Sequence, residues 1–124
     1  MPTTRPVFLE LWRIHLPIPG FVSILHRLSG ILMVLAIPVV AILFEQALSG
    51  PDGFAATAAI LASWPVKLIL LVLLWSLLHH LLAGLRHLLM DLDIGLDRPV
   101  ARRNAWMVLI AAFVLLILLL ALGG

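Results

Sequence analysis

Three long runs of apolar residues dominate the hydrophobic pattern of the chain. They cover about residues 28–48, 66–90 and 105–122. A helix needs about 20 mostly apolar residues to cross roughly 30 Å of hydrocarbon, and each run is about that long. A backbone within lipid must satisfy its own hydrogen bonds, and the runs lack the alternation of barrel strands. The pattern therefore predicts an all-α integral membrane protein with three transmembrane helices.

Turn and interface residues mark the ends of these runs. Trp64 and Trp106 stand at the start of the second and third runs, where an amphipathic ring suits the headgroup layer. Residues 50–53 form a Gly-Pro-Asp-Gly turn cluster. Residues 54–63 are expected to form a short helix on the membrane surface. Pro38 lies inside the first run and should kink its helix.

The first 22 residues differ from the rest of the chain. We expect residues 1–22 to form a cytoplasmic N-terminal arm and residues 23–124 to form the membrane domain. Pro17 and Pro19 are expected to break the chain before the first span. The arm carries apolar residues at helical spacing that could lie in the interface, namely Leu9, Trp12 and Leu16. No convincing removable targeting peptide is visible.

Composition narrows the class of protein further. Apolar residues make up 64% of the chain and charged residues only 11%, and the mean hydropathy is +1.22. These values exclude a soluble enzyme, a disordered chain and a nucleic-acid-binding domain. The chain has no cysteine, which excludes disulfides, thiolate zinc sites and iron–sulfur ligation by this chain.

The basic residues are distributed unevenly between the two ends of the spans. With three spans, one side of the membrane receives most of them, namely Arg5, Arg13, Arg27, Arg86, Arg98, Arg102 and Arg103. Only Lys67 marks the other side. Because cytoplasmic loops carry an excess of Lys and Arg, this predicts a cytoplasmic N-terminus. The expected location is a bacterial inner membrane, which the chain crosses several times.

Ionisable side chains inside a span are costly and therefore point to function. In the second run, His80, Gly84 and His87 share one helix face. His80 could ligate haem iron there, and Gly84 would leave space for the flat ring. His80 and His87 are about 10.5 Å apart along the helix, too far to ligate one iron. A second ligand must then come from another helix or another chain.

A second polar group lies at the start of the first run. His26 and Arg27 should share the depth of Arg86 and His87, and such a cationic belt suits haem propionates or a quinone carbonyl. Simpler interpretations exist: the arginines could extend to the interface, and His79 and His80 could form interhelical hydrogen bonds. Ser29 and Gly30 are best explained as small residues in helix packing.

Two motifs in these segments resemble a known family. Residues 23–30 read Ser-Ile-Leu-His-Arg-Leu-Ser-Gly, which is similar to the S-x-x-H-R-x-[ST]-G pattern of that family. Residues 80–91 begin with His, carry Gly-Leu-Arg-His at 84–87 and end with Asp, which resembles H-x-x-x-G-[IL]-R-H-x-x-x-D. The family is the cytochrome b membrane-anchor subunit of succinate dehydrogenase, or respiratory complex II.

The resemblance implies a set of roles for these residues. His80 would be an axial ligand of haem b, although His79 beside it is a second candidate. The other ligand would come from a companion small anchor subunit, which shares the haem. Ser23 and Arg27 would line the ubiquinone site, and His26, Arg27 and His87 would lie near the haem propionates. The anchor pair would dock a flavoprotein and an iron–sulfur subunit, which oxidise succinate and pass electrons to quinone.

Two other functions are compatible with parts of the sequence. A two-haem cytochrome b of another respiratory complex would place His80 and His87 on separate haems. That assignment needs two further histidines on a facing helix, and only His26 is near. A non-redox structural subunit or small transporter would use the histidines for packing or proton relay. Transporters usually show inverted repeats, and this chain shows no such repeat.

Overall fold

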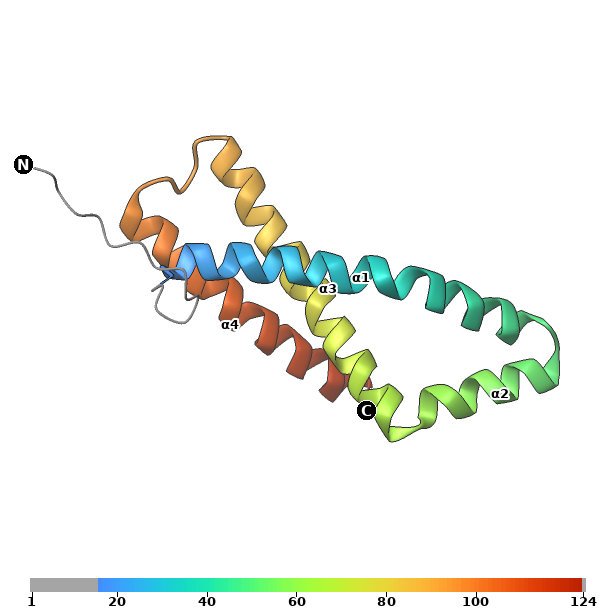
Figure 1. Ribbon diagram of the computed structural model, residues 1–124. Coiled ribbons are helices and arrows are strands. Elements are labelled where there is room, and N and C mark those ends of the chain that lie inside the picture. The colour runs from blue at the N-terminus through green and yellow to red at the C-terminus, as the bar shows by residue number, and fades with distance from the viewer. Residues whose placement is uncertain (1–15, 124) are drawn as a thin grey trace, which may run out of the picture.

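The computed structural model describes residues 16–123 (Figure 1). All regular secondary structure within these residues is helical. The helices are α1 (Ile18–Leu48), α2 (Pro51–Ala62), α3 (Trp64–Asp91) and α4 (Arg98–Gly123). Three of them, α1, α3 and α4, are long and apolar enough to cross a membrane. This confirms the all-α class and the three predicted spanning helices.

The first long helix begins earlier than the apolar run suggested. Pro17 occupies the N-cap of α1, and Pro19 lies within the first turn. The expectation that both prolines break the chain before the span is therefore wrong for Pro19. A first-turn residue has no intrahelical partner for its N–H, so proline is tolerated there. The predicted boundary between residues 22 and 23 falls inside α1.

Two other predictions for the first 48 residues, a kink at Pro38 and an interface helix in the N-terminal arm, are not tested by the structure. The helix α1 continues through Pro38, and the kink expected there stays a prediction. The interface helix expected around Leu9 and Trp12 lies outside the described residues.

The predicted short helix between the first two spans is present as α2. It follows Gly50, whose φ of 142° is a backbone conformation that glycine adopts without strain. Thr57 on α2 is buried, and its hydroxyl can donate to the Gly53 carbonyl within α2 at 3.0 Å or to Oε1 of Gln46 on α1 at 3.2 Å. The contact with Gln46 joins α2 to the end of α1. Its position at the membrane surface stays a prediction.

The apolar part of the packed centre between the three long helices consists of small side chains. Val22 of α1, Ala83 of α3, and Ala105 and Val108 of α4 form the buried cluster. Small residues let helix backbones approach closely where lipid supplies no hydrophobic driving force between helices. Most large apolar side chains of these helices are instead exposed on the outside of the molecule. The chain is therefore a thin bundle with a large apolar exterior.

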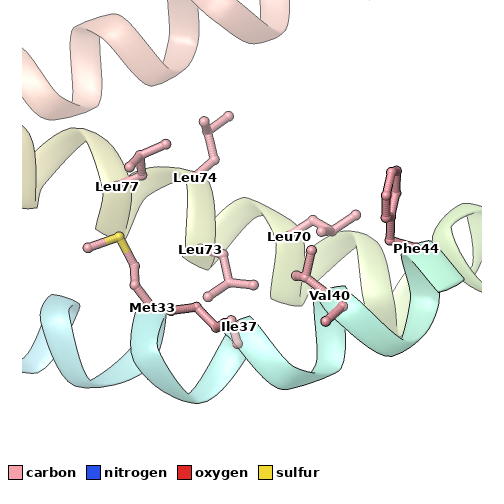
Figure 2. Close-up of a pocket in the computed structure, with 10 residues that line it drawn as sticks. Met33, Ile37, Val40, Phe44, Leu70, Leu73, Leu74 and Leu77 are labelled. Carbon is pink, nitrogen blue, oxygen red and sulfur yellow. The ribbon is translucent and has the colours of Figure 1, made fainter.

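The helices α1 and α3 cross and then separate toward α2 (Figure 1). The separation leaves an apolar groove of about 630 Å³ (Figure 2). Met33, Ile37 and Phe44 line it from α1, and Leu73 and Leu77 line it from α3. The histidines of the spans, at positions 26, 79, 80 and 87, lie nearer the other end of the bundle.

Candidate functional site

The helix α3 carries two stripes of residues along its length, and each residue of the second stripe directly follows a residue of the first in the sequence. Ser76, His79, Ala83 and Arg86 are buried, and we call them the core stripe. His80, Gly84 and His87 are each partly exposed, and we call them the histidine stripe. Successive residues of a helix are turned by about 100°, so the two stripes face different surroundings.

The histidine stripe meets α1 at His26. The imidazoles of His26 and His80 are stacked, with ring centroids 4.0 Å apart and planes at 12°. The ring of His87 meets His26 edge-on, at 4.9 Å and 83°. A Cβ on Gly84 would lie 3.6 Å from Nε2 of His26, so His26 also covers the glycine. The structure thus brings His26, His80, Gly84 and His87 into one group, as the helical spacing indicated.

An open hollow of about 380 Å³ lies beside this group. Three imidazoles and a glycine contribute to a wall that is otherwise apolar, and the full lining is His26, His80, Leu81, Gly84, Leu85, His87 and Leu88. A hollow with apolar walls and a few convergent polar groups is typical of a cofactor site. Within residues 16–123, no group of three or more His, Cys, Asp or Glu converges to chelate a bare metal ion. A haem needs only one ligand from each side of its ring.

The hydrogen bonding of His80 fits an axial haem ligand. Its Nδ1 lies 3.0 Å from the carbonyl oxygen of His26. Metal-ligating histidines usually donate one ring N–H to a carbonyl or carboxylate, and this bond orients the ring. The donation from Nδ1 leaves the lone pair of Nε2 for a metal. The residues of this hollow therefore fit a haem bound through His80.

The neighbouring histidine lies in different surroundings. His79 has no exposed surface, and its ring stacks on Trp75 with centroids 5.1 Å apart. Neither ring nitrogen of His79 has a hydrogen-bond partner within the described chain. His79 therefore points into the packed helices, whereas His80 borders the hollow.

Arg86 does not join the belt that the sequence predicted. It is only 5% exposed, and its Nη2 donates to the carbonyl of Ala101 on α4 at 3.4 Å. It lines a hollow of about 280 Å³ between α3 and α4, together with Asn104. The expected meeting of Arg86 with His26 and His87 is therefore wrong. Equal depth in the membrane does not imply the same side of a helix, and Arg86 belongs to the core stripe.

Ser23 and Arg27 lie one turn apart on α1. Ser23 is partly buried, and Arg27 is exposed. Residues four apart share a helix face, so both can contribute to one site. Ser23 precedes His26 by three residues, so this face borders the one that carries His26.

Two residues beside His80 were not predicted as parts of the site. Ser29 is fully buried, and its Oγ lies 3.2 Å from Nδ1 of His80. Gly30 lies against the same ring. A sequence signal existed, because Ser29 and Gly30 follow His26 by three and four residues and so share its face.

Comparison with known proteins identifies the chain's relatives. The family described as succinate dehydrogenase/fumarate reductase transmembrane subunit matches residues 1–119. The succinate dehydrogenase cytochrome b556 subunit of Coxiella burnetii is 34% identical over 120 residues, which cover 95% of each chain. The subunit with the same name from Paracoccus denitrificans is 33% identical over 116 residues, covering 94% of this chain and 89% of that one.

These matches span nearly the whole chain and agree with its three spanning helices. They also agree with the two motifs that carry the resemblance. Both named relatives are bacterial, and the chain is accordingly a multi-pass bacterial membrane protein. The chain belongs to the family of transmembrane subunits of succinate dehydrogenase and fumarate reductase.

Proposed function

We propose that this chain is the membrane-anchor cytochrome b subunit of succinate dehydrogenase. In this function it binds one haem b through His80 and helps to form a ubiquinone site. The observation that carries the proposal is the position of His80, which borders an open hollow and bonds through Nδ1 to the His26 carbonyl. Family membership and the cytochrome names of the relatives support the presence of haem b.

Each residue around the hollow has a role in this proposal. His80 holds the iron through Nε2, and Gly84 leaves space beside it for the flat ring. His26 and His87 lie near the haem propionates, where imidazoles can act as hydrogen-bond donors. When bound, haem supplies one-electron transfer. The protein orients the His80 imidazole, and the apolar walls of the hollow exclude water.

The proposed quinone site is on the adjacent face of α1. Ser23 offers a hydroxyl and Arg27 a guanidinium, and both can donate to a carbonyl oxygen of ubiquinone. Arg27 is exposed in this chain, so it can reach a bound quinone or a haem propionate. A charged donor also stabilises negative charge that develops on the oxygen during reduction.

The proposal requires partner subunits. Since this chain offers one axial ligand, the second comes from a companion small anchor subunit in the same bilayer. The chain has no cysteine to ligate an iron–sulfur cluster. In this proposal the clusters belong to an iron–sulfur subunit, and succinate is oxidised on a flavoprotein subunit. We place the N-terminus on the cytoplasmic side of a bacterial inner membrane, where those subunits would dock.

The alternatives have less support from the arrangement of the histidines. A two-haem cytochrome b would require His80 and His87 to face separate haems. Both instead border one hollow, and both contact the ring of His26. A purely structural subunit would not need His80 to border an open hollow, because a packing histidine is expected to be buried as His79 is.

A matched pair of variants tests the ligand assignment. His80→Leu and His79→Leu make the same substitution at adjacent positions, in the complex purified from native membranes. We expect His80→Leu to lose the low-spin b-type signal in a reduced-minus-oxidised spectrum, and His79→Leu to retain it. Reduction of an artificial dye by succinate reports whether the flavoprotein and iron–sulfur subunits are still present. An unchanged haem spectrum in His80→Leu would make His79 the next candidate.

A further inference from the structure

The surface of α1 that covers His80 consists of three residues. His26, Ser29 and Gly30 are spaced at i, i+3 and i+4, which places them on one helix face. His26 contacts the His80 ring by stacking and through its carbonyl, and Ser29 does so through its hydroxyl. Gly30 lies so near the ring that an added Cβ would contact it. The ring is thus held on several sides by a helix that is distant in sequence.

The hydrogen bonds around Nδ1 of His80 determine which ring nitrogen carries the proton. Its two neighbours are the His26 carbonyl at 3.0 Å and Oγ of Ser29 at 3.2 Å. A carbonyl oxygen can only accept a hydrogen bond. The Ser29 hydroxyl donates to the same carbonyl at 2.8 Å, so its lone pairs face Nδ1. Both neighbours therefore accept, Nδ1 carries the proton, and Nε2 is unprotonated.

The backbone of α1 also comes close to the His80 ring at Gly30. A Cβ added there would lie 3.1 Å from Cε1 and 3.5 Å from Nδ1 of His80. The shorter distance is below ordinary carbon–carbon contact, which begins near 3.5 Å. An alanine at position 30 therefore requires the imidazole or the two helices to give by a few tenths of an ångström. Glycine at this position lets the ring lie where it is without that shift.

We propose that Ser29 and Gly30 are positioning residues for the haem ligand. Ser29 supplies a second acceptor for Nδ1–H beside the His26 carbonyl and so makes Nε2 a stronger donor to iron, and Gly30 gives the ring space in its present orientation. This inference rests on the proposed role of His80 as an axial ligand. It gives a functional reason for the Ser-Gly pair that ends the first motif, beyond helix packing.

The chemical consequence is a change in reduction potential. An acceptor on Nδ1–H makes Nε2 a stronger donor and favours ferric over ferrous iron. Ser29→Ala removes one of the two acceptors and leaves the His26 carbonyl. We expect the preference for ferric iron to fall by about tenfold, which raises a one-electron potential by about 59 mV. Ser29→Thr retains the hydroxyl and should restore the original potential.

The control for Ser29→Ala is Ser76→Ala. Ser76 is also a fully buried serine, but its hydroxyl has no partner within the described residues and makes no bond to His80. Both variants lose a buried hydroxyl of equal size. Redox titration of the haem in the purified complex should show a raised potential for Ser29→Ala only.

Gly30→Ala provides a second variant, with Gly20→Ala as its control on the same helix. A Cβ at Gly20 meets Pro17 at 3.6 Å, which is ordinary contact. We expect Gly30→Ala to change the electron paramagnetic resonance signal of low-spin haem or to lower haem occupancy. Gly20→Ala should resemble the unmodified complex in both measurements.

The outcomes separate this inference from the proposed function. Equal haem potentials in Ser29→Ala and Ser76→Ala, together with an unchanged resonance signal in Gly30→Ala, would refute the positioning role. A complex without haem, or a haem spectrum unaffected by His80→Leu, would instead refute the ligand assignment itself. A raised potential that Ser29→Thr reverses would support the inference.

Discussion

The two stripes of α3 place adjacent residues of the same type, His79 and His80, in different surroundings. In the histidine stripe, His80 borders a hollow, and its Nδ1 is hydrogen-bonded to the His26 carbonyl. In the core stripe, His79 is fully buried, and neither of its ring nitrogens has a partner within residues 16–123. A rotation of one residue thus separates a site that can bind a cofactor from a packed interior.

The unpaired polar atoms of α3 are concentrated on or beside the core stripe. They are Nε1 of Trp75, Oγ of Ser76, both ring nitrogens of His79 and Nε of Arg86. Burying such atoms without partners is costly, and most proteins avoid it. His80 borders a hollow that a ligand can enter, whereas His79 has no exposed surface, so His80 is the better candidate for a cofactor ligand.

The largest expected difference between the stripes comes from adding bulk at adjacent positions. Gly84→Leu would fill the hollow, and we expect the assembled complex to lose most of its haem. Ala83→Leu would overpack the fully buried centre, which typically costs about 1–3 kcal/mol and should reduce assembly itself. Haem content per assembled complex and the yield of complex distinguish the two.

A smaller side chain at the same glycine provides the control. In Gly84→Ala the new Cβ would meet Nε2 of His26 at 3.6 Å, which is ordinary contact, so α1 and α3 should keep their packing. The loss of haem should therefore be smaller than in Gly84→Leu. Full haem content in Gly84→Leu would contradict the assignment of the hollow to haem.

The next largest effect concerns Arg27, which is exposed on α1. Arg27→Ala should lower succinate-dependent ubiquinone reduction by about tenfold to a hundredfold, because a hydrogen bond to a charged group contributes about 1.5–3 kcal/mol. Reduction of an artificial dye, which bypasses the quinone site, should be unchanged. A normal rate of ubiquinone reduction would remove Arg27 from the quinone site.

The smallest effect is expected at Arg86, which is buried against α4. Arg86→Met removes the charge and keeps a long apolar side chain. The variant loses the bond to Ala101 but no longer has to bury a charge. Because these two effects oppose each other, we expect the free energy of unfolding to change by no more than about 1 kcal/mol. Thermal unfolding of the purified complex measures this change.

The same variant also tests the separation of the two stripes. Because Arg86 faces α4, the haem spectrum and ubiquinone reduction of Arg86→Met should match those of the unmodified complex. A shifted haem spectrum would mean that Arg86 acts with His26 and His87 after all.

Much of this arrangement could be predicted because it is local. Spans follow from the length of apolar runs, and the order of His80, Gly84 and His87 on one face follows from helical periodicity. The start of α1 was missed because proline disrupts a helix interior but not its first turn, and composition alone does not show where a helix begins.

The sequence by itself determined the membrane class, the three spanning helices and the candidate histidines. Each of these depends on hydropathy or on spacing within one helix. Only the tertiary structure decided that His79 is buried, that Arg86 meets α4 and that Ser29 contacts His80 across 51 positions. These outcomes depend on how α1, α3 and α4 rotate and cross, and small side chains at their contacts control that packing.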